Sequence, residues 1–300
     1  MTGIAFVGLG HMGLPMARNL LKAGHNVYGF DLQSPALEHF KAAGGKVCHN
    51  LAEVARDRDV LITMLQTGHQ VKQVCLDEKG LFAHAKTAAL YIDCSSIDVQ
   101  TSREIHVKAR ERGLLAVDAP VSGGVAGAEA ATLTFMVGGE DEAFKTAEEW
   151  LKVMGKTIIH TGGAGSGQAA KICNNMILGI SMIAVSEAFT LAQQLGLSAK
   201  KLFEVVNHAS GQCWVMSKYP PLPNLLDNVP ANKDYQPGFS AQMMLKDLNL
   251  SQDSAQTVTV NTPLAAKARE IYQQFIDKGL GHLDFSAIIT AIDQSMELSK

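Results

Sequence analysis

The 300-residue sequence predicts an α/β protein with an amino-terminal doubly wound sheet, a long helix and an all-helical carboxyl-terminal domain. Two observations predict this class. Up to about residue 160, short runs rich in β-branched residues alternate with helical periodicity, as expected for parallel strands covered by helices on both faces. From Gln168 onward the strand pattern stops, and nearly every segment has the spacing of a helix.

The expected strands are short and aliphatic, and they lie at residues 4–7, 27–30, 60–65, 90–93, 114–118, 133–137 and 157–160. Helical patterns fall between most of them, at residues 13–23, 99–112 and 141–154. Strands that alternate with helices are joined by crossovers, so we expect the sheet to be parallel.

Four glycines separate the two patterns: Gly162, Gly163, Gly165 and Gly167. We therefore expect two domains, residues 1–162 and residues 163–300. A helix from Gln168 to Leu195 would connect them and would span ~40 Å at the usual rise per residue. Further helices are expected at residues 199–208, 241–256, 264–278 and 286–298.

Composition and charge exclude several classes of protein. Hydrophobic residues make up 47% of the chain and the formal net charge is −3, so there is no basic field for nucleic acid or an anionic membrane. The first expected strand begins near residue 3 and leaves no room for a targeting segment, so we expect a cytoplasmic protein. The most apolar stretch, residues 172–192, is interrupted by Asn174, Asn175, Ser181, Ser186 and Glu187, which favours a buried core helix over a membrane span.

The five cysteines are scattered and form no Cys-x-x-Cys pair, which indicates buried thiols in a reducing compartment. Cys173, two residues after Lys171, is expected to be a small apolar filler. No His-Glu-x-x-His or comparable cluster is present, so we expect no metal.

A glycine pattern after the first expected strand predicts a dinucleotide site. The run Gly8-Leu9-Gly10-His11-Met12-Gly13 has the form G-x-G-x-x-G between a strand and a helix, which is typical of a Rossmann-type domain. Gly8 permits the tight turn, Gly10 lets the backbone approach a pyrophosphate, and Gly13 lets the helix pack on the strand. Alone, such a cluster often marks only a turn, but its flanking elements favour cofactor binding.

Asp31 ends the second expected strand, where an acidic residue binds the adenosine ribose hydroxyls of NAD. A carboxylate there repels the 2′-phosphate of NADP, and no arginine follows that could neutralise it. The sequence therefore favours NAD. The alternative is that Asp31 caps the helix that begins near Ser34.

Two further segments carry polar groups suited to a small substrate. Ser122, Gly123 and Gly124 follow an expected strand, and a hydroxyl with bare backbone N–H groups can bind a carboxylate. Their alternative is a glycine turn between strands. Lys171 and Asn175 lie four residues apart and share one face of an apolar helix, although a lysine that reaches solvent beside a packing asparagine is the alternative.

Four ordered segments resemble the β-hydroxyacid dehydrogenase family over essentially the whole chain. Residues 8–20 are similar to its cofactor signature and residues 118–124 to its substrate signature. Residues 167–175 resemble its catalytic signature, and Lys246-Asp247-Leu248 its cofactor-closing motif.

The resemblance implies roles for individual residues. Lys171 would be catalytic at the substrate hydroxyl, while Ser122, Gly123, Gly124 and Asn175 would hold the substrate. Residues outside the glycine loop that would contact NAD are Leu65, Gln66, Ser96 and Lys246. Two positions depart from the family: Gln66 stands where a proline is common, and Ser95-Ser96 where Ser-Thr is common.

Residues 209–214, the Pro-rich loop and Tyr235-x-x-Gly238-Phe239 are most similar to the branch that oxidises 3-hydroxyisobutyrate to methylmalonate semialdehyde in valine breakdown. The alternatives are a related reductase of tartronate or succinic semialdehyde, and a non-enzymatic NAD-binding sensor or scaffold. Lys171 could act as a base with a lowered pKa or as a charged hydrogen-bond donor. The family and the long apolar helix both suggest a homo-oligomer, a dimer or a tetramer.

Overall fold

The computed structural model describes residues 2–293. Contacts within the chain divide it into two compact units, Met1–Lys171 and Ile172–Lys300, and the division falls inside the long helix α9 (Ser166–Gln194). Each unit has its own hydrophobic core. The predicted helix at residues 286–298 ends outside the described residues.

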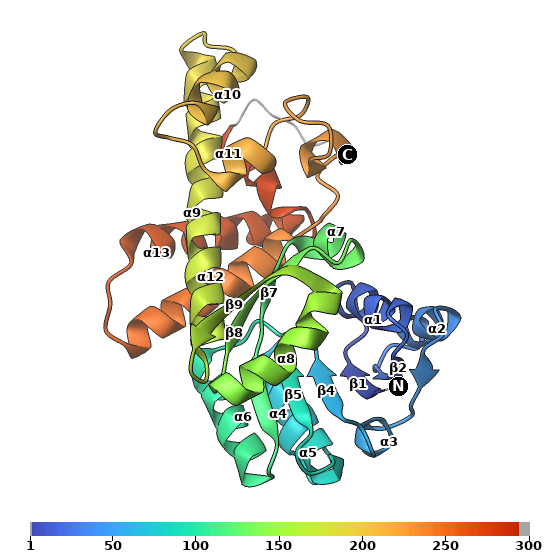
Figure 1. Cartoon of the computed structure of the whole chain (residues 1–300). Helices are drawn as coiled ribbons and strands as arrows, with labels where there is room; N and C mark the ends of the chain where they lie inside the picture. Colours follow the sequence, from blue (N-terminus) through green and yellow to red (C-terminus); the bar gives the residue numbers. More distant parts are fainter. Residues whose placement is uncertain (1, 294–300) are drawn as a thin grey trace. The chain divides into compact units, whose positions relative to one another are not determined.

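A nine-stranded sheet forms the centre of the first unit (Figure 1). Its strands are β1 (Gly3–Val7), β2 (Asn26–Phe30), β3 (Lys46–Val47), β4 (Val60–Thr63), β5 (Leu90–Asp93), β6 (Leu115–Asp118), β7 (Val121–Ser122), β8 (Leu133–Gly138) and β9 (Gly155–Gly162). Their order is β3-β2-β1-β4-β5-β6-β8-β7, and β9 also pairs with β8. The order reverses between β1 and β4, so the carboxyl ends of these two strands border the crevice where such sheets bind ligands.

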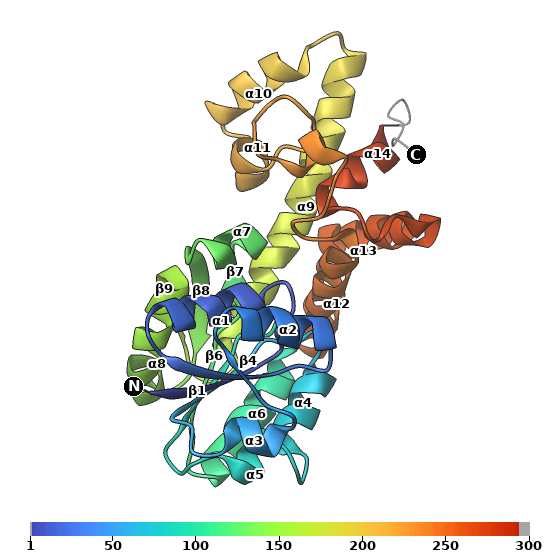
Figure 2. The same cartoon turned by 90° about the vertical axis from the view of Figure 1, so that its right-hand side faces the viewer.

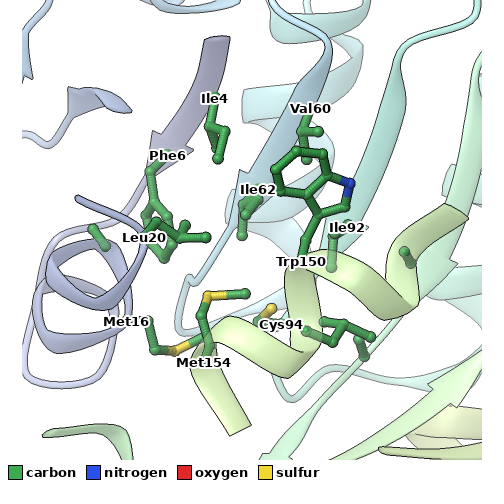
Figure 3. Close-up of a cluster of buried hydrophobic side chains, with 14 of the residues drawn as sticks. Ile4, Phe6, Met16, Leu20, Val60, Ile62, Ile92, Cys94, Trp150 and Met154 are labelled. Atoms are coloured by element: carbon green, nitrogen blue, oxygen red, sulfur yellow. The ribbon is translucent and has the colours of Figure 1, made fainter. Parts of the chain in front are cut away.

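Most of the helical side chains in the core on one face of this sheet come from α1 (Gly13–Lys22) and α8 (Asp141–Met154). Figure 3 shows Met16 and Leu20 of α1 and Trp150 of α8 gathered with aliphatic side chains of the central strands. Ile4 and Phe6 of β1 belong to this core, and both are fully buried.

The other face has a second core. Ala5 and Val7 of β1 belong to it, because successive residues of a strand point to opposite faces. The helices that pack there are α3 (Leu51–Ala55), α4 (Gly68–Leu76), α5 (Leu81–His84) and α6 (Val99–Glu111). Helices on both faces confirm the doubly wound sheet. The first unit also contains α2 (Ser34–Ala42) and α7 (Gly124–Glu129).

Side-chain caps explain where three of these helices begin. Asn50 accepts a hydrogen bond from the Glu53 N–H, Thr67 from the Gln70 N–H, and Asp98 from the Thr101 N–H. Each cap satisfies a backbone donor that the first helical turn leaves without a partner.

The strand at 133–137 was expected to be parallel, but β8 runs antiparallel to both β6 and β7. Only β7 and the short α7 separate β6 from β8, and the chain turns back along its neighbour instead of crossing over a face of the sheet. The two-residue strands β3 and β7 had no pattern long enough to predict them.

The described part of the second unit contains no strand, only the isolated bridge between Ser240 and Asp284 (Figure 2). Besides α9 its helices are α10 (Ala199–Asn207), α11 (Trp214–Lys218), η1 (Pro230–Lys233), α12 (Ala241–Thr257), α13 (Pro263–Phe275), η2 (Ile276–Leu280), η3 (Phe285–Ile288) and α14 (Ile289–Ile292). This agrees with the predicted all-helical carboxyl-terminal domain.

Helix α9 is the one helix among residues 2–293 with the length and hydropathy of a membrane span. Met182, Ile183 and Phe189 lie in the core of the second unit, whereas Ile177 and Leu191 are each 61% exposed. The expected core helix is therefore buried on one face only.

The expectation of buried thiols is correct for Cys48, Cys75 and Cys94, but Cys173 is exposed and Cys213 is partly exposed. Cys173 lies on the outer side of α9, so its expected role as an apolar filler is wrong.

Candidate active site

The glycine loop between β1 and α1 has the geometry that its sequence predicted. Gly8 has φ +93°, and a Cβ added there would overlap the carbonyl oxygen of Met64 at the end of β4. A Cβ at Gly13 would overlap the carbonyl oxygen of Gly8, so this glycine is needed for α1 to approach the loop. By contrast, a Cβ at Gly10 would have no atom within 4 Å, which leaves open space above the backbone for a ligand.

The residues between these glycines contribute mainly through their backbone. The Leu9 side chain is 1% exposed and belongs to the core, so only its main chain can face a cofactor. His11 is exposed, and Met12 is the N-cap residue of α1 without a side-chain cap bond. The first N–H groups of α1 therefore lack a capping side chain, as in helices that bind phosphates.

Asp31, one residue after β2, connects this loop to the next helix. One carboxylate oxygen accepts a hydrogen bond of 2.6 Å from the Leu9 N–H, and the other accepts one of 2.8 Å from the Gln33 N–H. Gln33 is the N-cap residue of α2, and this helix has no side-chain cap bond, so the alternative that Asp31 caps it is wrong. The bond to the Leu9 N–H instead fixes the glycine loop.

At the next strands, Ser95 and Leu65 hold the carboxyl ends of β5 and β4 together. The Leu65 N–H donates to the Ser95 hydroxyl oxygen at 2.8 Å, and the Ser95 N–H donates to Asp93 at 3.0 Å. Ser96 is half-buried beside this contact, whereas Gln66 is exposed and its N–H donates to the side chain of Gln70. Ser95 was noted in the sequence only beside Ser96 and was given no role, yet its hydroxyl performs this structural task.

Asp93 is a buried carboxyl group beneath this edge of the sheet. It is 3% exposed and accepts a hydrogen bond of 2.9 Å from the Thr63 hydroxyl. Burial raises the pKa of Asp93 to about 6, and its hydrogen bonds offset only part of that effect.

Ser122, Gly123 and Gly124 form the turn between β7 and α7. Gly123 has φ +136° and Gly124 φ +63°, so both need the conformational freedom of glycine. Ser122 pairs with Thr134 of β8 and is half-buried, and Gly123 is exposed. The glycines lead from a strand into a helix and do not form the turn between strands that the alternative expected.

Lys171 and Asn175 lie one turn apart on α9, where Lys171 is half-buried and Asn175 is 1% exposed. The amide oxygen of Asn175 accepts a hydrogen bond of 2.9 Å from Asn174, and its amide group donates to the carboxylate of Asp247 on α12. Asp247 is 4% exposed, and Lys246 lies 3.6 Å from its other carboxylate oxygen. Asp247 is thus a further residue of the site. In the sequence it was named only as part of the Lys246-Asp247-Leu248 motif and was given no role.

These features fit NAD. The uncapped start of α1 and the space above Gly10 suit a pyrophosphate, and Asp31 suits a ribose diol. Among residues 2–293, no group of three or more metal-ligating side chains is close enough to hold a metal ion.

Two family models match the chain. The NAD binding domain of 6-phosphogluconate dehydrogenase matches residues 3–162, and the NAD-binding domain of NADP-dependent 3-hydroxyisobutyrate dehydrogenase matches residues 165–292.

Individual proteins are similar over nearly the full chain. An NAD-dependent L-serine dehydrogenase of Pseudomonas aeruginosa is 44% identical over 98% of this chain and 98% of that protein. The mitochondrial 3-hydroxyisobutyrate dehydrogenase of Rattus norvegicus is 42% identical over 96% of this chain and 86% of its own length. A solved structure of Mycobacterium tuberculosis 3-hydroxyisobutyrate dehydrogenase with L-serine is 46% identical, with a TM-score of 0.92, and the match covers 97% of this chain and 99% of that one.

The Rossmann-type fold and its glycine site define an NAD-dependent oxidoreductase. The chain belongs to the β-hydroxyacid dehydrogenase family and is similar to 3-hydroxyisobutyrate dehydrogenases within it. The non-enzymatic sensor or scaffold is therefore set aside.

Proposed function

We propose that this enzyme oxidises 3-hydroxyisobutyrate to methylmalonate semialdehyde, a step of valine breakdown. The observation that carries the proposal is the helical face shared by Lys171 and Asn175, where Asp247 orients the asparagine amide. Relatives named 3-hydroxyisobutyrate dehydrogenase, at 42% and 46% identity, support this substrate.

In the proposed mechanism, Ser122, Gly123 and Gly124 bind the substrate carboxylate through the serine hydroxyl and backbone N–H groups. Asn175 binds the substrate through its oriented amide. Lys171 acts at the substrate hydroxyl, where it either accepts the departing proton or, when charged, stabilises the alkoxide that forms. NAD held by the glycine loop and Asp31 would supply the acceptor for the hydride of the β-carbon.

The proposed cofactor residues fall into two groups. The glycine loop from Gly8 to Gly13 and Asp31 bind the pyrophosphate and the adenosine ribose. Residues expected to contact the nicotinamide side are Leu65, Gln66, Ser96 and Lys246. We also propose residues 1–162 as the NAD-binding domain and residues 163–300 as the domain for substrate binding and oligomerisation.

L-serine is a second candidate substrate. The 44% identical relative is named an L-serine dehydrogenase, and the similar M. tuberculosis structure contains L-serine. L-serine and 3-hydroxyisobutyrate both carry a hydroxyl on the carbon β to a carboxylate, so the same hydroxyl and carboxylate contacts suit either. A related reductase of tartronate semialdehyde or succinic semialdehyde is the remaining alternative.

The second unit also supports the proposed homo-oligomer, a dimer or a tetramer. Its large exposed hydrophobic side chains include Ile177, Leu191, Leu195, Val258 and Leu264, each more than half exposed. Such side chains are commonly covered at subunit interfaces. A cytoplasmic location stays a prediction.

A substrate panel tests the proposed function. Purified protein is mixed with NAD or NADP, and reduction of the nicotinamide is followed by absorbance with 3-hydroxyisobutyrate, L-serine, glycerate, 4-hydroxybutyrate and 6-phosphogluconate. The highest kcat/KM should be obtained with 3-hydroxyisobutyrate and NAD. A higher value with L-serine would make the second candidate the substrate. Activity only with glycerate or 4-hydroxybutyrate would favour the semialdehyde alternatives.

A further inference from the structure

The first turn of α9 is attached to the segment that follows β5 by one buried side chain. Gln168 is fully buried, its amide oxygen accepts a hydrogen bond of 3.0 Å from the Ile97 N–H, and its amide nitrogen donates one of 2.8 Å to the Ser95 carbonyl oxygen. These two backbone groups lie on either side of Ser96. Gln168 therefore holds the backbone around a proposed cofactor contact.

Asp118, at the end of β6, holds the same turn from another side. Its carboxylate accepts hydrogen bonds of 2.8 Å from the Gly165 N–H and 2.9 Å from the Gln168 N–H, and His106 Nε2 lies 3.0 Å away. The group is 1% exposed and caps α9 from a distant part of the chain. A carboxylate at this position satisfies donors that the first turn leaves unpaired, and it faces the positive end of the helix dipole.

Glycines bring the helix start against the strands. A Cβ added at Gly167 would overlap the carbonyl oxygens of Met136 and Asp118, and one at Gly138 would come within 2.7 Å of the Gly167 nitrogen. The first turn therefore lies directly against β6 and β8, with no room to shift toward them.

We propose that Gln168 is a positioning residue that sets Lys171 relative to the Ser96 segment, an inference that rests on the proposed catalytic role of Lys171. Lys171 follows Gln168 by three residues and lies on the same side of the helix. Since Gln168 bonds to both neighbours of Ser96, one amide fixes the helical turn that carries the lysine and the backbone expected to contact the cofactor. Asp118 fixes the position of that turn along the helix axis.

The test compares Gln168→Ala with Gln194→Ala, a matched change at an exposed position near the end of the same helix. Loss of the Gln168 amide should lower kcat about 10²-fold, the effect of a small misplacement of a catalytic group, with a much smaller change in the NAD dissociation constant. Gln194→Ala should leave both values unchanged. Thermal unfolding of each variant shows whether the fold is retained.

Gln168→Glu adds a readout that a purely structural role would not produce. The protonated carboxyl group can accept from the Ile97 N–H and donate to the Ser95 carbonyl, whereas the carboxylate cannot donate. The ratio of its kcat to that of the unmodified enzyme should therefore rise as pH falls. If this ratio of kcat values changed with pH only in parallel with the melting temperature of Gln168→Glu, the inference would be overturned.

Hydrogen exchange of the amides of residues 165–171 tests the attachment without substrate, and Gln168→Ala should exchange faster there. If the unmodified chain oxidises no hydroxy acid, the proposed function fails. In that case the exchange measurement still tests the attachment, which is overturned if Gln168→Ala exchanges as slowly as the unmodified chain. If the unmodified chain is active and Gln168→Ala retains normal kcat, only the positioning inference is overturned.

Discussion

Asn175 on α9 donates a hydrogen bond from its side-chain amide to the carboxylate of Asp247, 72 residues further along the chain. Because Asn174 donates to the amide oxygen of Asn175, the orientation of this amide is fixed from both ends. The side chains of Asn175 and Asp247 are both buried. A buried amide held in this way is pre-organised to bind a substrate, since its orientation needs no change on binding.

Replacing Asp247 with alanine should therefore impair substrate binding. The Asn175 amide would lose its acceptor, and leaving a buried donor without a partner costs about 1–3 kcal/mol. If this free-energy cost destabilises the complex with substrate, kcat/KM for the hydroxy acid decreases about 10- to 100-fold. Asp253→Ala, an exposed aspartate on the same helix, is the control. Unchanged kcat/KM in Asp247→Ala would show that Asn175 does not need this partner.

Asp31 is expected to select NAD while it also holds the glycine loop. Asp31→Asn keeps an acceptor for the Leu9 N–H but removes the charge, so it should relax discrimination against NADP with little loss of NAD affinity. Asp31→Ala removes both functions and should weaken NAD binding as well. Fluorescence titration with each cofactor measures the two affinities. An unchanged ratio of NAD affinity to NADP affinity in both variants would leave Asp31 with only its contacts to the Leu9 and Gln33 N–H groups.

Asp93 should make stability depend on pH. Its pKa is raised from 3.8 to about 6 by burial, so the folded state binds this proton more tightly than the unfolded chain. The stability that protonation contributes is fully present below pH 3.8 and is lost as pH rises through about 6. Relative to the unmodified protein, Asp93→Asn should gain up to about 3 kcal/mol between these limits, because an amide never ionises.

Urea unfolding at pH 4 and pH 7 measures this difference, with Asp77→Asn at an exposed position as the control. A stability difference between Asp93→Asn and the unmodified protein that stays constant with pH would contradict the assignment.

Local patterns were sufficient to predict the parts of the fold that depend on neighbouring residues. The glycine loop and Asp31 are set by a strand, a tight turn and a helix start, all within 30 residues. The doubly wound sheet likewise follows from alternating strands and helices. The antiparallel direction of β8 depends on how the chain turns after Asp118, and a strand pattern does not encode direction.

The partners of buried polar groups could not be predicted in the same way. Gln168 appears in the sequence as one polar residue near the start of an apolar helix, but it bonds to the main chain of Ser95 and Ile97, 73 and 71 residues earlier. Asp247 likewise accepts its hydrogen bond from Asn175 only because α9 and α12 pack together. Such contacts depend on tertiary packing. When the partner is a main-chain group, the residue type at that position gives no indication of the contact.

The oligomer prediction can be checked directly. Light scattering coupled to size-exclusion chromatography should give a mass at least twice that of the 32.1 kDa chain. Charged substitutions at Leu191 and Leu195, which are 61% and 75% exposed, should shift the population toward monomer if α9 forms the interface. A monomeric mass for the unmodified protein would contradict the prediction.

Oxidation of 3-hydroxyisobutyrate by Lys171→Ala, measured together with its affinity for NAD, is the most direct test of Lys171 as the catalytic residue. Lys200→Ala, an exposed lysine in the second unit, serves as the control and should behave as the unmodified enzyme. Lys171→Ala should lose turnover but bind NAD with nearly unchanged affinity, because the glycine loop and Asp31 remain intact. Near-normal turnover in Lys171→Ala would contradict the assignment of Lys171 as the catalytic residue.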